Sequence, residues 1–360
     1  MCCGDATDRR SSGRRSRTGS PGRRCPRPAR RPPWVTSSCG SRAKRDRWRW
    51  RYTPLPAAGS VPCVLLELGE RRFDLAERPL VMGILNRTPD SFFDAGAYWD
   101  FDDFLAKAEQ LRADGADILD VGGVKAGPGE EVSAGEEAER VVPAVAALAA
   151  RFDVPLSVDT WRAAVAEEAY AAGAVLGNDI SGFADPDYLP AAADAGASVV
   201  ACHVRLTPRY ADPEPVYGDL LGEVRDYLAE RASWAAFAGL GRSRVLLDAG
   251  LDLGKTPAMS AELLRRSDHL AALGYPVLLS ASNKGFLGWL CGAELGDRAA
   301  ASTAAHALGA FGGCGVIRAH DVRAARRVAH VTAELRRRCA AVQPGAPSAA
   351  PAEVAAGTAP

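Results

Sequence analysis

The sequence contains no run of 18 or more apolar residues, so it predicts no membrane span. It contains no CxxC pair either: its nine cysteines are scattered, and no signal-peptide pattern accompanies them. Cysteines in this arrangement indicate free thiols in a reducing compartment, and we therefore expect a cytoplasmic protein. A GxxxxGK[ST] phosphate loop and the Gly-rich first turn of dinucleotide-binding domains are also missing, which argues against both kinds of nucleotide site.

Positive and negative charges balance, with 44 Lys and Arg against 44 Asp and Glu, but they are unevenly placed. Residues 1–53 hold about 16 Lys and Arg residues and about 3 Asp and Glu residues. The rest of the chain is therefore acidic, which disfavours nucleic-acid binding. The Arg- and Pro-rich start cannot bury enough apolar surface to fold alone. We expect a disordered tail over 1–60, a folded domain over 61–340 and a disordered Ala- and Pro-rich tail over 341–360. A nucleic-acid tether remains the alternative for the first tail.

Eight short apolar runs follow from about residue 62, mostly separated by Ala-, Leu- and Glu-rich stretches of helical length. Each run is nearly continuous in apolar residues, as expected for parallel strands that are buried on both faces. The runs cover residues 79–86, 116–123, 154–160, 174–180, 198–204, 244–250, 276–282 and 314–320. This pattern predicts an α/β fold, a (β/α)8 TIM barrel, with a doubly wound open sheet as the alternative.

Polar or ionisable residues stand at the end of nearly every predicted strand. They are Asn86, Asp120, Asp159, Asn178, Asp179, His203, Asp248, Ser282, Lys284, Arg318 and His320. In a barrel these ends meet at one mouth, where converging amides and carboxylates need a partner. A flat heterocycle with amide-like edges fits that requirement, because carboxylates accept from its N–H groups. For Asp159 alone, a helix cap is the alternative.

A basic pair ends the last predicted strand, where this fold often holds phosphate. With Asn86 at the end of the first strand, Arg318 and His320 predict a site for a phosphoryl leaving group, with Mg²⁺ as a candidate bridging ion. If His320 is considered alone, the alternative is a core histidine whose hydrogen bonds are satisfied within the protein.

Several motifs resemble, in order, those of dihydropteroate synthases, over roughly residues 79–335. They read GILNRTPDSFFDAG, DILDVGG, LSVDT, GNDISG, LGYPVLLSASNKGFLG and IRAHDV. The resemblance implies a TIM barrel, a homodimer and a transferase of folate biosynthesis. Such an enzyme condenses 6-hydroxymethyl-7,8-dihydropterin pyrophosphate with p-aminobenzoate and releases pyrophosphate, with Mg²⁺ as the cofactor.

The resemblance also implies roles for individual residues. The implied catalytic residues are Asp90, Lys284 and Arg318, of which Asp90 lies in the loop 88–92 that closes over the reacting carbon. The implied pterin-binding residues are Asp159, Asn178, Asp248 and Lys284. The implied pyrophosphate-binding residues are Asn86, Arg318 and His320, and Asn86 is also the implied metal ligand.

Three motifs depart from the family pattern. Its GGESTRPG reads GGVKAGPG at 122–129, its SRKSF reads SNKGF at 282–286, and its DPGFGFGK reads DAGLDLGK at 248–255. The pterin-edge residues survive, whereas those that hold the aminobenzoate and the closed loop do not. We therefore expect a divergent relative whose condensation activity is weak, changed or absent. A fully active dihydropteroate synthase and a non-catalytic pterin-binding protein are the alternatives; a methyltransferase on the same barrel is disfavoured, because methyl transfer needs no TPDSF loop.

Overall fold

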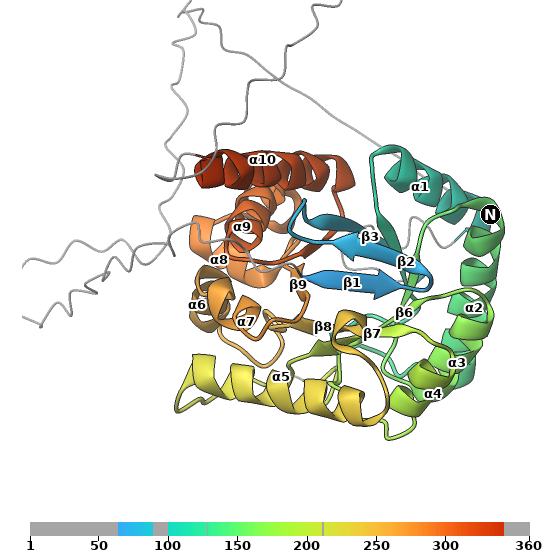
Figure 1. The fold of residues 1–360 in the computed structure, drawn as a ribbon. Helices are drawn as coiled ribbons and strands as arrows, with labels where there is room; N and C mark the ends of the chain where they lie inside the picture. The colour runs from blue at the N-terminus through green and yellow to red at the C-terminus, as the bar shows by residue number, and fades with distance from the viewer. Residues whose placement is uncertain (1–63, 89–99, 128, 211, 342–360) are drawn as a thin grey trace, which may run out of the picture. The chain divides into compact units, whose positions relative to one another are not determined.

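The computed structural model describes residues 64–88, 100–127, 129–210 and 212–341 (Figure 1). In this part of the chain eight parallel strands form a closed barrel, which confirms the predicted TIM barrel. The strands are β3 (Leu80–Asn86), β4 (Ile118–Gly122), β5 (Leu156–Asp159), β6 (Leu176–Asp179), β7 (Ser198–Cys202), β8 (Val245–Asp248), β9 (Val277–Ser280) and β10 (Val316–Ala319). Because β10 pairs with both β9 and β3, the alternative of an open sheet is wrong.

Helices surround the barrel and connect its strands (Figure 1). They are α1 (Phe101–Ala113), α2 (Ala134–Arg151), α3 (Ala163–Ala171), α4 (Tyr188–Asp194), α5 (Leu220–Phe237), α6 (Pro257–Arg265), α7 (Ser267–Ala271), α8 (Gly285–Cys291), α9 (Ala299–Phe311) and α10 (Val322–Ala341). Local sequence sets where they begin. The Ser133 hydroxyl accepts from the Glu136 amide, and the Glu136 carboxylate accepts from the Ser133 amide, so a capping box starts α2.

Side chains along each barrel strand point alternately toward the helices and into the barrel. On β3, Val81 and Leu85 belong to the large apolar cluster that joins strands and helices. Met82 belongs to a second cluster inside the barrel. The residues of this interior cluster that lie on the barrel strands are Leu80, Met82, Ile118, Leu176, Val200, Leu246, Leu278 and Val316.

A hairpin that the sequence did not predict covers the end of the barrel where its strands begin. Its strands, β1 (Leu65–Leu68) and β2 (Arg71–Asp74), form a separate antiparallel sheet. Leu66, Leu68 and Leu75 are buried and complete the interior cluster. In Figure 1 the blue hairpin lies in front of the ring of strands. The barrel floor is therefore apolar, and a polar ligand finds its partners at the opposite mouth.

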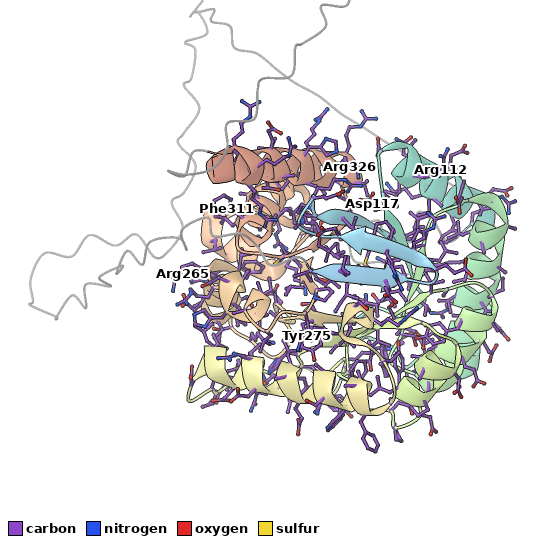
Figure 2. The ribbon with its side chains drawn as sticks, in the orientation of Figure 1. Arg112, Asp117, Arg265, Tyr275, Phe311 and Arg326 are labelled. Carbon is purple, nitrogen blue, oxygen red and sulfur yellow. The ribbon has the colours of Figure 1, made fainter. Side chains whose placement is uncertain are left out.

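Charged contacts at the hairpin end hold the barrel together. Asp117, just before β4, accepts from Arg78 at 2.7 and 2.8 Å, from Arg326 at 2.9 and 3.0 Å, and from the Val81 amide at 2.9 Å. Asp117 and Arg326 lie close together in Figure 2. These contacts connect β3 and β4 to the last helix, α10, and so help to close the ring.

Candidate active site

A polar layer lies directly above the apolar floor of the barrel. On four strands a polar residue follows the interior apolar residue by two positions, which puts both on the same face. The pairs are Ile118 and Asp120 on β4, Leu176 and Asn178 on β6, Leu246 and Asp248 on β8, and Val316 and Arg318 on β10. The polar member is nearer the carboxyl end of its strand, which is the end where TIM barrels carry their active sites.

Arg318 joins two carboxylates of this layer. Its Nε donates to Asp120 Oδ2 and its Nη2 donates to Asp159 Oδ2, each at 2.6 Å. The Asn178 amide donates to the same oxygen of Asp120 at 3.3 Å. Asp120, to which the sequence motifs gave no role beyond a polar strand end, is therefore the centre of the site.

The electrostatics of this cluster favour a ligand that donates hydrogen bonds. Burial raises the pKa of Asp159 to about 7, a rise that Arg318 opposes and Asp120 reinforces. Burial acts against the charge of Arg318, yet Asp120 and Asp159 raise its pKa above the ordinary value. The guanidinium stays charged and is shared by two carboxylates, which leaves acceptor capacity on their oxygens.

One oxygen in the cluster lacks a partner. Asp120 is fully buried, and its Oδ1 has no hydrogen bond from the described residues. A buried acceptor left unsatisfied costs about 1–3 kcal/mol, so it calls for a donor from a ligand or water. Asp159 does not cap the next helix, because α3 starts after Arg162 without a side-chain cap. The alternative reading of Asp159 as a cap is therefore wrong.

A tight turn after β8 fixes Asp248 at the mouth. Its Oδ1 accepts from the Gly250 amide at 2.7 Å. Gly250 has a φ of +62°, and a Cβ at this position would lie 1.9 Å from the His203 carbonyl oxygen. Only glycine fits such a position, so the DAG segment of the motif serves to hold the Asp248 carboxylate.

Lys255 ties the same turn to β7. Its ammonium donates to the carbonyl oxygens of Gly250 and Leu253 at 2.9 Å, and it lies 2.9 Å from Nδ1 of His203. Burial lowers the pKa of Lys255 to about 8, and burial followed by Lys255 itself lowers the pKa of His203 to about 3. This lysine is structural, which the motif alone did not reveal.

Lys284, a predicted pterin and catalytic residue, immediately precedes α8. Its ammonium donates to the Leu251 carbonyl oxygen in the loop after β8. The side chain is half-buried at the mouth, beside the loop that follows Asp248. A ligand carbonyl would share or replace this contact.

The residues predicted to bind pyrophosphate are spread over β3 and β10. Asn86 ends β3, next to Gly122 on β4. His320 Nδ1 lies 2.9 Å from the Ser282 hydroxyl, and a pocket of about 160 Å³ adjoins both residues. Burial, and then Arg318, lowers the pKa of His320 to about 3. The neutral ring offers an anion a hydrogen bond, not a charge. Asp90, the third predicted catalytic residue, lies outside the described residues.

The predicted Mg²⁺ depends on oxygen atoms that the chain does not supply by itself. Within the described ranges, no group of three or more His, Cys, Asp or Glu residues is placed to hold a metal ion. At Asn86 the ion would take one amide oxygen from the protein and its other oxygens from ligand phosphates and water. Such a donor set suits Mg²⁺, which keeps several waters and binds mainly through substrate phosphates.

The altered motif residues lie around the mouth in different environments. In the second loop, Ala126 is exposed and Gly127 is half-buried. Asn283 is buried with a φ of +58°, and its side-chain oxygen accepts from Ser302 on α9 at 3.2 Å. Its side chain therefore bonds to the helical layer.

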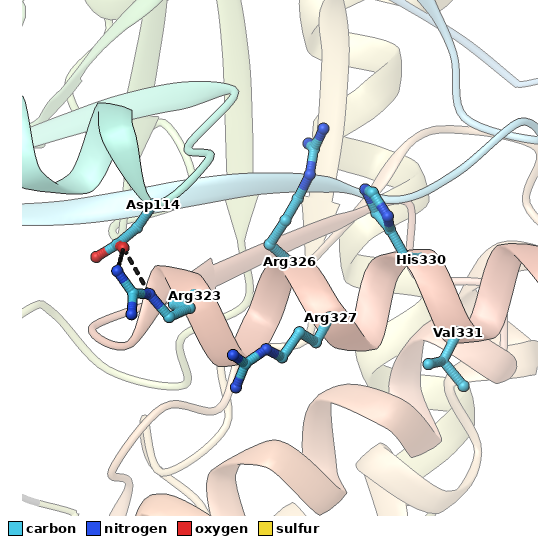
Figure 3. A pocket seen from close by; sticks show the side chains of 6 residues that line it. All are labelled: Asp114, Arg323, Arg326, Arg327, His330 and Val331. Carbon is cyan, nitrogen blue, oxygen red and sulfur yellow. Dashed lines mark hydrogen bonds and ion pairs between the residues drawn. The ribbon is translucent and has the colours of Figure 1, made fainter. Parts of the chain in front are cut away.

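A separate surface pocket of about 390 Å³ lies along α10 (Figure 3). It is lined by Asp114, Arg323, Arg326, Arg327, His330 and Val331. Arg323 pairs with Asp114 at 2.8 Å and Arg326 pairs with Asp117, so protein carboxylates neutralise two of its arginines. This pocket is not part of the candidate active site.

Comparison with known proteins places this geometry in a family. A family model described as pterin binding enzyme matches residues 82–320. A protein named inactive dihydropteroate synthase 2 of Mycobacterium leprae is 42% identical over 266 residues, which cover 72% of this chain and 91% of that protein.

None of the helices in the described ranges is long and apolar enough to cross a membrane.

Solved structures of dihydropteroate synthases are also similar to this chain. The dihydropteroate synthase of Yersinia pestis, in complex with a sulfonamide drug, has a TM-score of 0.73 and 37% identity, covering 76% of this chain and 100% of that one. The dihydropteroate synthase of Xanthomonas albilineans, solved with 4-aminobenzoic acid, has a TM-score of 0.69 and 39% identity. The match covers 75% of this chain and 97% of that one. The chain belongs to the pterin-binding enzyme family of the dihydropteroate synthases, transferases of folate biosynthesis.

Proposed function

We propose that the chain binds 6-hydroxymethyl-7,8-dihydropterin pyrophosphate in the barrel mouth and condenses it with p-aminobenzoate only weakly or not at all. The observation that carries the pterin half is the buried Asp120, whose Oδ1 has no partner among the described residues. A pterin edge presents N–H and NH2 donors, and Asp120, Asp159 and Asp248 offer acceptors at one mouth.

The family reaction forms one bond and breaks another. The amine nitrogen of the second substrate bonds to the CH2 carbon of the pterin, while the carbon–oxygen bond to pyrophosphate breaks and pyrophosphate keeps the electron pair. The amine proton leaves to water. In this chain the carboxylate layer would orient the pterin, and Asn86, Arg318 and His320 would contact the departing pyrophosphate. When bound, Mg²⁺ would supply the positive charge that favours departure of pyrophosphate.

Loss of turnover follows from which contacts are altered. The residues of the polar layer that the family motifs share are unchanged. The second loop, however, carries Lys125, Ala126 and Gly127 where the family motif has Ser, Thr and Arg. Loss of one donor to a developing charge costs about 2.7–4 kcal/mol, or about 10²–10³ in rate. Contacts made only in the closed transition state raise the rate, so pterin binding can persist while condensation fails. The M. leprae relative that is named inactive supports this proposal.

We also propose a homodimer through the face formed by α8, α9 and α10. Five large apolar side chains on these helices are between 47% and 61% exposed: Trp289, Leu290, Leu308, Val331 and Leu335. An apolar face of this kind is typical of a protein interface. Light scattering would give a dimer mass for the full chain, and Leu308→Glu with Val331→Glu would give a monomer.

A cytoplasmic location is supported by thiol chemistry. Cys202, Cys291 and Cys314 are all free thiols. Free thiols without structural disulfides are the usual state of cysteine in a reducing compartment.

The test separates binding from turnover. Calorimetry with the pterin pyrophosphate and Mg²⁺ should give saturable binding to the full chain, weakened at least 10-fold by Asp120→Asn and unchanged by Asp187→Asn, a matched change at an exposed site. Pyrophosphate release and dihydropteroate formation are then followed separately with p-aminobenzoate. Absence of pterin binding refutes the proposal. Dihydropteroate formation at about 1 per second or faster would show instead a fully active synthase.

A further inference from the structure

An aspartate occupies the corner where the loops after β8 and β9 meet. The side chain of Asp252 reaches across to the start of α8, where its Oδ2 accepts from the Phe286 amide at 3.2 Å. Its own amide donates to the Ser260 hydroxyl at 3.0 Å. These two bonds connect the loop after β8 with α8 and α6, so the carboxylate is held in one place.

The backbone of Asp252 is unusual for a side chain of any size. Its φ is +65°, in the left-handed region that glycine adopts without cost and that few other residues tolerate. The DPGFGFGK motif of the family has glycine at this position, whereas this chain reads DAGLDLGK. Aspartate is one of the few residues that accept such a φ, because its short side chain bonds locally. The conformation is therefore kept while a carboxylate is added.

A second substitution makes room for this carboxylate. A Cβ at Gly285 would lie 3.3 Å from Asp252 Oδ2, tighter than ordinary van der Waals contact. The family motif has serine at this position, in SRKSF, and this chain has glycine. The two changes form a matched pair: a side chain is lost from the loop after β9, and a carboxylate from the loop after β8 takes the space.

Several hydrogen-bond donors around this corner already have acceptors within the protein. The Phe286 amide is bonded to Asp252, and the Lys284 ammonium donates to the Leu251 carbonyl. Arg298 donates to the carbonyl oxygens of Asn283 at 3.1 Å and Ala293 at 3.3 Å. An incoming carboxylate would meet the negative charge of Asp252, and the Phe286 amide would have to exchange partners to receive it.

We infer that Asp252 is a specificity-determining residue for the second substrate, and that the corner formed by Asp252, Gly285 and Phe286 selects an amine whose far end is neutral or cationic instead of an anionic aminobenzoate. The inference rests on the proposed function. An amine that reaches a pterin above Asp248 extends outward past the loops after β8 and β9, which carry Asp252 and Gly285. A like charge placed there is repelled in a partly desolvated corner, and such repulsion is an effective means of discrimination.

The test measures binding in a complex that cannot react. The full chain is saturated with 6-hydroxymethylpterin and inorganic pyrophosphate, and p-aminobenzoate and its neutral isostere p-aminobenzamide are titrated separately in the calorimeter. We expect the amide to bind at least 10-fold more tightly than the acid. Asp252→Asn, which tolerates the positive φ, and Asp252→Gly should each reduce this ratio at least 10-fold. Asp297→Asn, at an exposed position in the turn Leu295–Asp297, should leave it unchanged.

The outcomes distinguish the inference from the function on which it rests. If the pterin itself fails to bind, the proposed function fails and the inference fails with it. If the pterin binds but neither amine does, or the acid binds as tightly as the amide, the inference alone is overturned. A ratio that is the same in Asp252→Asn and in the unmodified chain overturns it as well.

Discussion

Replacement of Arg318 by methionine should destabilise the barrel strongly, because the guanidinium holds two carboxylates away from bulk water. Asp120 is 0% exposed and Asp159 15%, and each bonds to Arg318 at 2.6 Å. Removal of one partner from a buried ion pair costs about 3–5 kcal/mol, since a charge remains buried without compensation. We therefore expect Arg318→Met to lower the free energy of unfolding by about 3–5 kcal/mol above neutral pH.

The decrease in the free energy of unfolding caused by Arg318→Met should become smaller as the pH falls. Burial raises the pKa of Asp159 to about 7, against the opposing effect of Arg318, so loss of the arginine raises this pKa further. A carboxyl whose pKa is raised on folding adds stability at low pH, and that stability is lost as the pH rises through the folded pKa. The variant should therefore be most impaired at about pH 8.5 and should recover part of the difference at about pH 5.5, where a proton replaces the guanidinium.

Urea unfolding at both pH values measures this effect, with the midpoint and slope compared between variant and parent. Arg323→Met is the matched control, because Arg323 is 64% exposed and pairs with Asp114 in the surface pocket of Figure 3. Its loss should be about 0–1 kcal/mol and independent of pH in this range. Equal losses in the two variants, or an Arg318→Met deficit that does not change with pH, would refute the reasoning.

Three further results are expected. Asp248→Asn should weaken pterin binding at least 10-fold in calorimetry, because an acceptor in a dry layer becomes a donor opposite the pterin N–H edge. Leu66→Ala should lower the free energy of unfolding by about 2–5 kcal/mol in urea, since its fully buried side chain seals the barrel floor. Ala126→Thr, Gly127→Arg, Gly285→Ser and Asp252→Gly, combined, should raise dihydropteroate formation at least 10-fold in an assay of that product, and the single changes should do much less because the loops act as a unit. Unchanged values in any of these assays would contradict the role given to that residue.

The barrel could be predicted from the sequence because each of its strands is a nearly continuous apolar run. A strand buried on both faces leaves this pattern whatever its neighbours are. The hairpin could not, because β1 and β2 have four residues each, only β1 carries buried residues, and β2 has none. Such short segments resemble ordinary loops until the barrel floor on which Leu66 and Leu68 lie is known.

The sequence could predict which residues make up the site, but not which of them bond to each other. Polar strand ends pointed to Asp159, Asn178 and Asp248, because strand direction decides where those residues meet. The motifs could not reveal that Arg318 lies between Asp120 and Asp159, since residues on strands far apart in the sequence make those contacts. Asp252 is not predictable from the sequence for a related reason, because its significance depends on a backbone angle and on its hydrogen bond to another loop.

The hairpin has a consequence for the order of folding. It is synthesised before the barrel strands, yet Leu66 and Leu68 pack in a cluster that extends to Val316 on the last strand. Contacts between segments so far apart in sequence form slowly, because a long chain must be ordered before they can be made. We therefore expect the hairpin to dock last, after the ring of strands has closed, with its leucines unburied until then. A chain stalled before β10 would expose those leucines to chaperones or to aggregation.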